Sequence, residues 1–366
     1  MAQNSESALS RRSFLKTALA GAGAAALPTI IVPGKVHAFQ KGQRIHPNIS
    51  PLKVVGLRDE KMTTDRRLRV GWNKQEEAVN SKAVATNIDR LATTLAGESN
   101  VRKAWETIFV KPPGKAWNDV VVAIKTNNIA QQHTRSAVMA KICHVLTDVL
   151  GVKGQHIHIY DAKHGGSISR GTPFKGLPDG VEIENTWGGM RSQAPVPAPW
   201  KSGSKSSQCV TALAEGKADI LIDIAMCKGH GGRFGGFTMC CKNHFGSFSP
   251  RPGHAGDGTD YLLSINKSEA ILGKQNARGR VEFPRQQLCI VDALWASRPG
   301  PSGHPTAQPN ALFMGVCGPV VDYQIATKFR KEAMGWPVNQ TVADRFLSDF
   351  GFTPDKLPSG GKIITP

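Results

Sequence analysis

The chain has 366 residues, with 46 Lys and Arg against 28 Asp and Glu, so its formal charge at pH 7 is +18. Apolar residues make up 40% and charged residues 20%, which is enough to bury a core and excludes a disordered chain. Seven cysteines are too few for a disulfide scaffold, and the 38 glycines and 23 prolines follow no period that would indicate collagen. The excess positive charge leaves three partners to consider: nucleic acid, a membrane surface or a small anion.

The N-terminus carries an export signal. Residues 10–16 read Ser-Arg-Arg-Ser-Phe-Leu-Lys, which matches the twin-arginine motif, and residues 17–32 form an uncharged run. That run is shorter than the roughly 20 residues that span a bilayer. Val36 and Ala38 place small residues at positions −3 and −1 of a cleavage site. We expect the twin-arginine translocation machinery to export the protein to the periplasm and residues 1–38 to be removed; an uncleaved membrane anchor is the alternative.

Removal of this segment changes what the charge means. Residues 1–38 hold four basic residues and one acid, so +15 of the +18 stays with the mature chain. An exported protein is kept away from nucleic acid, and an aromatic content of 7% offers few platforms on which bases could stack. We therefore expect no nucleic-acid partner. Twin-arginine export passes folded proteins, so a cofactor can be inserted before export.

The periodicity of the mature chain alternates between strand and helix. The β-branched runs predict strands at residues 53–57, 119–125, 156–160, 220–224, 288–292 and 311–316. Helical spacing predicts helices at residues 134–150, 206–215, 319–334 and 341–350. The continuous apolar run at 120–124 is typical of a strand covered on both faces. The fold class is α/β, a mainly parallel sheet flanked by helices, with Gly/Pro-rich loop insertions at 171–205 and 247–260.

The sequence patterns predict four parts of the chain. They are the signal peptide at 1–38, an extended arm at 39–51, an α/β domain at 52–335, and a C-terminal helix and tail at 336–366.

The densest chemical signal follows the strand at 220–224. Five glycines lie between Gly229 and Gly236, and glycines allow backbone N–H groups to approach an anion closely. Lys228, Arg233 and Lys242 add positive charge there. Loops beyond the carboxyl ends of parallel strands form the usual binding crevice. The pattern predicts a basic crevice lined by Gly231, Gly232 and their neighbours, with a flexible hinge carrying solvated lysines as the alternative.

Histidines and carboxylates after strands are candidate metal ligands. Asp161 and His164 follow the strand at 156–160, and His230 follows the strand at 220–224. Asp322 lies at a predicted helix start. Such a mixed set would suit zinc, iron or manganese. His244, His254, Asp257 and Asp260 form a further group without a recognised metal spacing.

The cysteines give no standard metal motif. No C-x-x-C occurs, and an odd number leaves at least one thiol unpaired in a monomer. The adjacent Cys240 and Cys241 are consistent with a strained vicinal disulfide, a metal ligand or buried small hydrophobes.

Several ordered motifs resemble the DUF362 family. They are Val-Ala-Ile-Lys-Thr-Asn at 122–127, Cys-Lys-Gly-His at 227–230, Thr238, Lys-Asn-His-Phe-Gly at 242–246, Asp292 followed by Gly-Pro-Ser-Gly at 300–303, and Asp322 after a terminal strand. The resemblance covers roughly residues 50–335 and implies the architecture better than an activity. The chain lacks the ferredoxin cysteines that many relatives carry for iron–sulfur clusters, and its Lys-Gly-His segment is richer in glycine.

Together these signals predict one site. Its lining would be Lys125, Asn127, Lys228, His230, Lys242 and Asn243. The lysines would fix an anion, His230 would act as a metal ligand or general acid/base, and Asp292 and Asp322 would orient these groups or bind metal. The expected catalytic residues are His230, Lys228 and Asp292. The alternative for the aspartates at strand ends and helix starts is a role as helix caps and turn residues. We expect an enzyme that depends on a metal or cofactor and acts on a small anionic substrate. The cofactor would be a divalent metal or an iron–sulfur cluster. The alternatives are a non-catalytic iron–sulfur, metal or ligand carrier with an electron-transfer role, and a binder of the envelope surface.

Overall fold

The computed structural model describes residues 39–129, 131–161, 174–185, 191–200, 203–358 and 363–364. The predicted signal peptide and His164 lie outside the described residues. In the part of the chain that is described, no helix combines the length and the hydrophobicity needed to cross a membrane.

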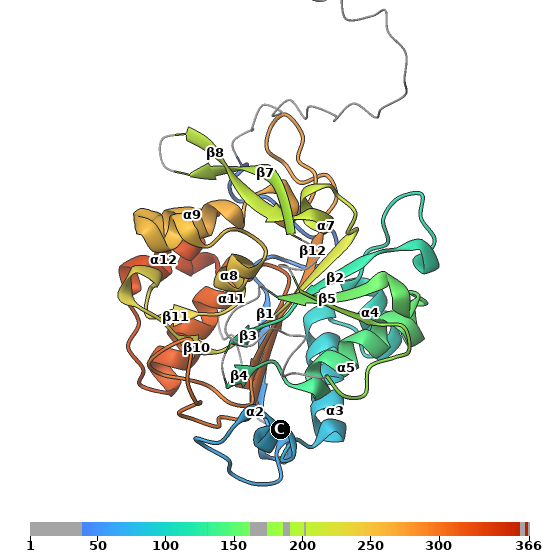
Figure 1. Ribbon diagram of the computed structural model, residues 1–366, viewed down its shortest axis with the longest axis vertical. Coiled ribbons are helices and arrows are strands. Elements are labelled where there is room, and N and C mark those ends of the chain that lie inside the picture. Colours follow the sequence, from blue (N-terminus) through green and yellow to red (C-terminus); the bar gives the residue numbers. More distant parts are fainter. Residues whose placement is uncertain are drawn as a thin grey trace, which may run out of the picture. The chain divides into compact units, whose positions relative to one another are not determined.

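The centre of the structure is an eight-stranded mixed sheet (Figure 1). Its strands are β1 (Val54–Arg58), β2 (Val122–Lys125), β5 (Ile157–Asp161), β6 (Glu182–Asn185), β9 (Ile220–Met226), β12 (Gln286–Ala293), β13 (Ala311–Gly315) and β14 (Ile363–Ile364). Their order across the sheet is β14-β1-β13-β12-β9-β2-β5-β6. The neighbours from β12 to β6 are parallel, and only β13 runs antiparallel to both of its neighbours. The prediction of an α/β fold with a mainly parallel sheet is confirmed.

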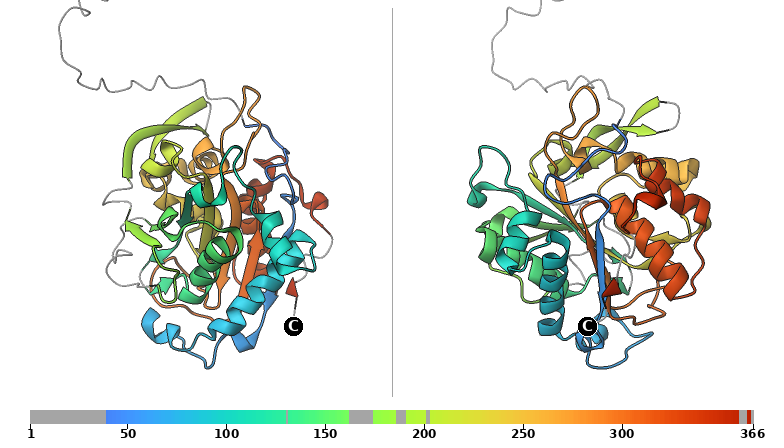
Figure 2. Two further views of the ribbon diagram at one scale, coloured as in Figure 1. Left: turned by 90° about the vertical axis from the view of Figure 1, so that its right-hand side faces the viewer. Right: turned by 180° about the vertical axis from the view of Figure 1, so that it is seen from behind.

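Helices cover both faces of this sheet (Figure 1, Figure 2). They are α2 (Trp72–Glu76), α3 (Ser81–Ala96), α4 (Val101–Ile108), α5 (Ser136–His144), α7 (Thr211–Ala214), α8 (Cys240–Asn243), α9 (Gly258–Ile265), α10 (Glu269–Leu272), α11 (Gly318–Gln324) and α12 (Gln340–Ser348). The π-helical segments η3 (Val145–Leu150) and η8 (Ile325–Ala333) extend α5 and α11, and η7 (Gly253–Asp257) precedes α9. Short helical turns are η1 (Glu60–Met62), η2 (Trp117–Asp119), η4 (Gly154–His156), η5 (Gly232–Phe234), η6 (His244–Gly246) and η9 (Pro354–Lys356).

The two faces of the sheet carry side chains of different size. One face presents large aliphatic residues, such as Ile124, Ile222 and Ile290, to the core beneath α3, α4 and α5. The other face presents small residues, among them Ala123 and Ala225, beside larger ones such as Phe313 to the core beneath α8, α9, α11 and α12. Small side chains let a helix approach a sheet closely, so the second face leaves room for polar groups between sheet and helix.

The six predicted strands correspond to β1, β2, β5, β9, β12 and β13. The predicted helix at 134–150 is α5 with its extension η3, and it ends at Gly151, whose φ of 83° lies in the left-handed region. The predicted helices at 319–334 and 341–350 are α11 with η8, and α12.

The prediction for residues 171–215 is partly wrong. The segment predicted as a loop contains β6 and β7 (Arg191–Trp200), and the predicted helix at 206–215 is β8 (Gly203–Val210) followed by α7. β7 and β8 form an antiparallel hairpin. Prolines that alternate at 195, 197 and 199 place every missing N–H on one side of β7, which an edge strand tolerates. The predicted loop at 247–260 likewise contains η7 and the start of α9.

Two short two-stranded ribbons and one terminal contact complete the described fold. β3 (Asn128–Ile129) pairs with β4 (Gln132–His133), and β10 (Lys228–Gly229) pairs with β11 (Phe237–Thr238). Residues 39–51, predicted as an extended arm, contain no strand or helix, and Phe39 packs edge-on against Phe350 with ring centroids 5.3 Å apart.

The strand order locates the position at which a ligand is expected. From β2 the chain adds β5 and then β6 on one side, and it returns to add β9 and β12 on the other side. The order therefore reverses between β2 and β9. In open α/β sheets the binding crevice lies outside the carboxyl ends of the strands at such a reversal.

The core beneath α3 gives a test of this packing. Leu91 of α3 is fully buried, whereas Thr94 on the same helix is exposed. We expect Leu91→Ala to lower the free energy of unfolding by roughly 2–5 kcal/mol, because it leaves a cavity between helix and sheet. Thr94→Ala should change it by less than about 0.5 kcal/mol. Urea denaturation of both variants measures this, and equal effects would contradict the packing of α3 described above.

Candidate functional site

A row of side chains crosses the sheet beneath α8. Tyr160, Lys125, Asp223 and Cys289 are aligned on β5, β2, β9 and β12. Aligned residues of parallel strands point to the same face of a sheet. The amide of Asn243, the last residue of α8, accepts a hydrogen bond from Lys125 Nζ (2.9 Å) and donates one to Asp223 Oδ1 (2.6 Å). One helix residue thus joins two neighbouring strands.

Lys125 forms a buried ion pair at the carboxyl end of β2. Its Nζ lies 2.6 Å from Asp161 Oδ1, and the two side chains are 1% and 6% exposed. The other carboxylate oxygen of Asp161 accepts a hydrogen bond from the backbone N–H of Asn128 (2.6 Å). A Cβ at Gly246 would lie 2.4 Å from Lys125 Cε and 2.6 Å from Asp161 Oδ1. Only glycine at 246 leaves space for this pair.

Lys228 is a buried amine with neutral partners. It is 1% exposed, and its Nζ donates to Asn127 Oδ1 and to the backbone oxygens of Gln132 and Pro301, both at 3.2 Å. Among the described residues no carboxylate lies within ion-pair distance of this amine. Burial is the main cause that lowers the pKa of Lys228 to about 7. Asn127 also donates to Asn243 (3.0 Å), which links Lys228 to the row beneath α8.

Further cations gather beside Lys228. We call Lys228, His230, Arg233, Lys242 and His254 the basic cluster. Lys242 Nζ lies 3.4 Å from His254 Nε2 and over the rings of two phenylalanines, at 4.7 and 4.3 Å from their centroids. Burial lowers the pKa of Lys242 to about 7. Arg233 donates to the backbone oxygen of His254 (2.9 Å), and the rings of His230 and His254 stack at 6.5 Å.

His230 is neutral and has a defined tautomer. Its Nδ1 accepts a hydrogen bond from the backbone N–H of Gly231 (2.8 Å), so the ring proton of the neutral form is on Nε2. Burial first, and then the charges of Lys242 and the other cations of the cluster, lower the pKa of His230 to about 3. His230 therefore offers an N–H donor at neutral pH. This state suits an anion better than a metal ion, which needs a ring nitrogen with a free lone pair.

The two aspartates predicted to belong to the site, Asp292 and Asp322, accept hydrogen bonds from backbone N–H groups. Asp292 accepts from the backbone N–H groups of Arg135 (2.9 Å) and Leu294 (3.0 Å). Asp322 accepts from those of Cys240 (2.8 Å) and Cys241 (2.9 Å) at the start of α8, and burial raises its pKa to about 7.

The predicted metal ligands and glycines are also placed by the structure. Within the described residues Asp161, His230 and Asp322 do not gather around one point that could hold an ion, and His164 lies outside those residues. Gly231 and Gly232 are exposed, with open space where a Cβ would be.

The structure places one further charged residue, Asp223, in the site, which was not predicted from the sequence. Asp223 is fully buried in the middle of β9 and contacts Asn243. A charged residue inside a run of strand residues as apolar as Ile-Leu-Ile-Asp-Ile-Ala-Met is itself a signal, because aspartate is almost never fully buried without a partner.

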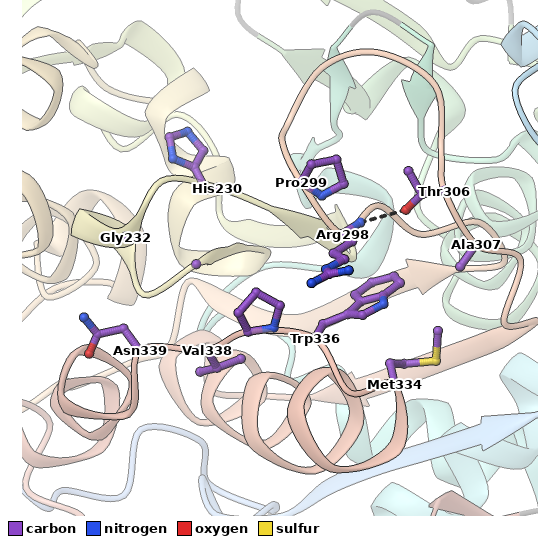
Figure 3. A pocket seen from close by; sticks show the side chains of 12 residues that line it. His230, Gly232, Arg298, Pro299, Thr306, Ala307, Met334, Trp336, Val338 and Asn339 are labelled. Carbon is purple, nitrogen blue, oxygen red and sulfur yellow. Dashed lines mark hydrogen bonds between the residues drawn. The ribbon is translucent and has the colours of Figure 1, made fainter.

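A cavity of about 880 Å³ lies next to the basic cluster. It is lined by His230, Gly232, Gly236, Arg298, Pro299, Thr306, Ala307, Met334, Trp336, Pro337, Val338 and Asn339. Figure 3 shows Arg298 and Trp336 in its middle and the imidazole of His230 turned away from it. The cavity is thus a largely apolar space whose edge is shared with the basic cluster.

All seven cysteines lie in the described part of the chain, and all are buried and free. Cys240 and Cys241 therefore form no vicinal disulfide. Burial raises the pKa of both thiols well above the usual value, as expected for thiols in an apolar core.

Two segments of the chain match models of known protein families. Residues 8–28 match the model of the twin-arginine translocation pathway signal sequence, so the protein is exported through that machinery, consistent with a periplasmic location. No curated protein and no solved structure matches the chain. Residues 122–327, more than half of the chain, match the family model described as a domain of unknown function, DUF362. This segment runs from β2 to the start of η8 and includes every residue of the basic cluster, and the chain belongs to the DUF362 family.

Proposed function

We propose that the basic cluster binds a small anionic ligand and that this exported protein is an enzyme acting on that ligand. The observation that carries the proposal is Lys228, an amine 1% exposed to solvent whose hydrogen-bond partners are three neutral oxygens. A buried charge is costly unless a group of opposite charge lies near it. A ligand carboxylate, sulfate or phosphate group would supply the missing negative charge.

The charge balance around Lys228 supports an anion in particular. Among the described residues neither Lys242 nor Arg233 has a carboxylate within ion-pair distance. The nearest anion of the network, Asp161, is held by Lys125 and by a backbone N–H group. Burial holds the pKa of both amines at about 7, and for Lys228 the attraction of Asp161 does not offset it. An anion bound among them would raise both pKa values.

The site has a buried layer of residues that would position Lys228 and an outer layer that would contact the ligand. The buried layer of Lys125, Asp161, Asn127 and Asn243 fixes the position of Lys228 through hydrogen bonds of 2.6 to 3.0 Å. The outer layer of Lys242 and His230 is partly exposed and offers donors to a ligand. An amine that titrates near neutral pH and a histidine N–H are suited to move a proton to or from a bound group.

The adjoining cavity would receive the rest of the substrate. Its walls include Met334, Trp336 and Val338, which favour an apolar body, and Arg298 adds a cation among them. We therefore propose a substrate with one anionic group and an uncharged part. A non-catalytic carrier, the alternative raised by the sequence, would bind the same ligand without converting it.

Sulfate binding at different pH values tests the proposal, because sulfate keeps its charge from pH 5.5 to 8.5 whereas phosphate does not. The charged form of Lys242 is lost as the pH rises through about 7, so sulfate affinity should be highest below pH 7. Above pH 7 it should fall by up to about tenfold per pH unit for each lysine that must be protonated. His230 should add no pH dependence in this range, because its pKa is about 3. Isothermal titration calorimetry measures this.

Lys242→Gln and Lys267→Gln form a matched pair for that experiment. Lys267 is also a half-buried lysine with a lowered pKa, and its amine lies 5.3 Å from the centroid of the Phe350 ring and 3.7 Å from Asp349. Lys242→Gln should weaken sulfate binding at pH 6 at least about tenfold, as expected for a charge-assisted hydrogen bond. Lys267→Gln should leave binding unchanged. Equal losses in the two variants would reduce the effect to net charge and refute a specific site.

Asn243→Ala tests the layer beneath the cluster. It removes the acceptor of Lys125 and the donor to Asp223, both buried, so we expect a loss of about 3 kcal/mol in the free energy of unfolding. Asn266→Ala is the control, because Asn266 is equally buried but donates only to backbone oxygens, at 3.0 and 2.8 Å. It should cost about 1 kcal/mol. At temperatures where both variants are folded, only Asn243→Ala should weaken sulfate binding, and intact binding in that variant would contradict its role.

A further inference from the structure

We propose that Asp223, Cys240 and Cys289 bind one zinc ion in the core beneath α8. This site is separate from the basic cluster. Of its three residues only Cys240 is considered as a metal ligand from the sequence, and Asp223 and Cys289 are not. It goes beyond the proposed function, and either proposal can fail while the other stands.

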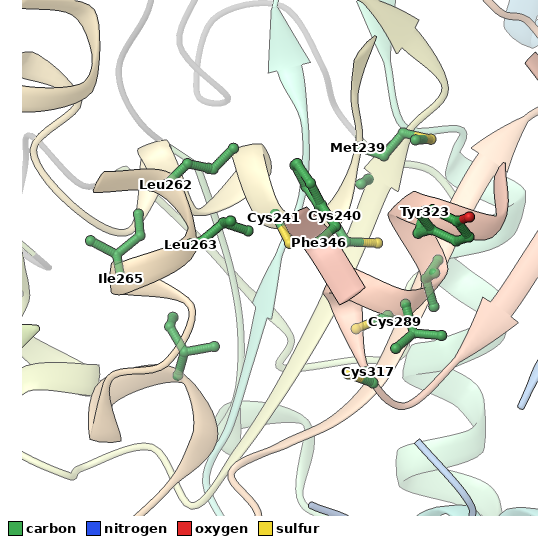
Figure 4. Packing of buried hydrophobic residues seen from close by; sticks show 14 of the residues in the cluster. Met239, Cys240, Cys241, Leu262, Leu263, Ile265, Cys289, Cys317, Tyr323 and Phe346 are labelled. Carbon is green, nitrogen blue, oxygen red and sulfur yellow. The ribbon is translucent and has the colours of Figure 1, made fainter. Parts of the chain in front are cut away.

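Three different elements bring the donor atoms together. Asp223 on β9 and Cys289 on β12 are aligned neighbours, and Cys240 is the first residue of α8 above them. One oxygen of Asp223 and the two sulfurs lie within 4.8 Å of one another, and all three residues are fully buried. Figure 4 shows Cys240, Cys289 and Cys317 in the same part of the core. Ligand atoms on a zinc tetrahedron lie about 3.4–3.8 Å apart, so a shift of roughly 1 Å would close the site.

Asp223 has one carboxylate oxygen that the protein leaves without a donor. Oδ1 accepts from Asn243, but no N–H or O–H group of the described residues donates to Oδ2. His244 Nε2 is 3.7 Å from Oδ2, but it lies only 2.7 Å from Gln286 Oε1, to which it donates, while Ser247 lies 3.0 Å from Nδ1. A fully buried carboxylate oxygen with no donor is rare in folded proteins. A cation between Oδ2 and the two sulfurs would satisfy it.

The charges of the site also fit a divalent ion. Two thiolates and a carboxylate carry three negative charges, of which zinc neutralises two. Burial raises the pKa of Asp223 well above its usual value, and the hydrogen bond from Asn243 and the charge of Lys125, which is aligned with Asp223 on the neighbouring strand, act in the opposite direction. Sulfur donors select zinc over magnesium or calcium. Cys317 is the next thiol, and it precedes Gly318, at which a Cβ would lie 3.7 Å from Cys289 Sγ.

The export route is consistent with this site. The protein passes the membrane folded, so zinc would be bound in the reducing cytoplasm, before the thiols meet an oxidising compartment. Once bound, the ion would hold Cys240 and Cys289 apart as ligands and would protect the adjacent sulfurs from forming a disulfide.

Metal analysis of the exported protein tests the proposal. Wild type should retain about one zinc per chain after gel filtration, measured by mass spectrometry of the elements. Cys240→Ala and Cys289→Ala should lose at least nine tenths of it. Cys143→Ala should lose none, because Cys143 is equally buried in the other core, beneath α5. Wild type without metal would overturn the proposal, whether its thiols are free or Cys240 and Cys289 form a disulfide.

A second measurement covers the case in which the alanine variants do not fold. Zinc is removed from folded wild type with a chelator and replaced by Co²⁺, whose bonds to thiolate sulfur absorb in the near ultraviolet. The expected result is a sulfur-to-cobalt band that saturates at one ion per chain and disappears when zinc is returned. Binding of Co²⁺ without such a band, or no binding, would refute cysteine ligation.

Discussion

The hydrogen bonds of Asn243 are the interaction on which the rest of the site depends. This one amide at the end of α8 accepts from Lys125 on β2 and donates to Asp223 on β9, and so it spans the two strands between which the strand order reverses. Asn127 donates to the same oxygen and accepts from Lys228. The positions of a buried acid and two buried amines are thereby fixed by a side chain that carries no charge.

The two faces of the sheet differ, and this difference allows polar groups to be buried without loss of the apolar core. The face beneath α3, α4 and α5 is built from large aliphatic side chains and packs as an apolar core. On the opposite face the residues near α8 include alanines and a cysteine, and polar groups find partners between helix and sheet there. Gly246 adds to this, because any larger residue would collide with the Lys125–Asp161 pair. One face of the sheet therefore carries an aliphatic core, and the other carries the buried polar residues of the site.

Much of this could be predicted from the sequence, and the rest could not, for physical reasons. The apolar runs of the central strands and the lysines and glycine-rich segment that follow them are local signals, and they gave the fold class and the members of the basic cluster. Alignment across strands is not local: Asp223 faces Lys125 and Cys289 only because β2, β9 and β12 are neighbours. The hairpin of β7 and β8 was missed because its prolines and serines suppress the strand signal that pairing restores. Nor does spacing show that Asp292 and Asp322 hold backbone N–H groups.

The central claim is that the basic cluster is a built anion site and not a patch of surface charge. A crystal structure of the protein soaked in selenate tests it most directly, because anomalous scattering from selenium locates the anion without reference to the protein. The account predicts an ordered selenate within hydrogen-bond reach of Lys242 Nζ and His230 Nε2, at a concentration at which the Lys242→Gln crystals show none. Selenate scattered over surface lysines, with no peak between Lys242 and His230, would contradict it.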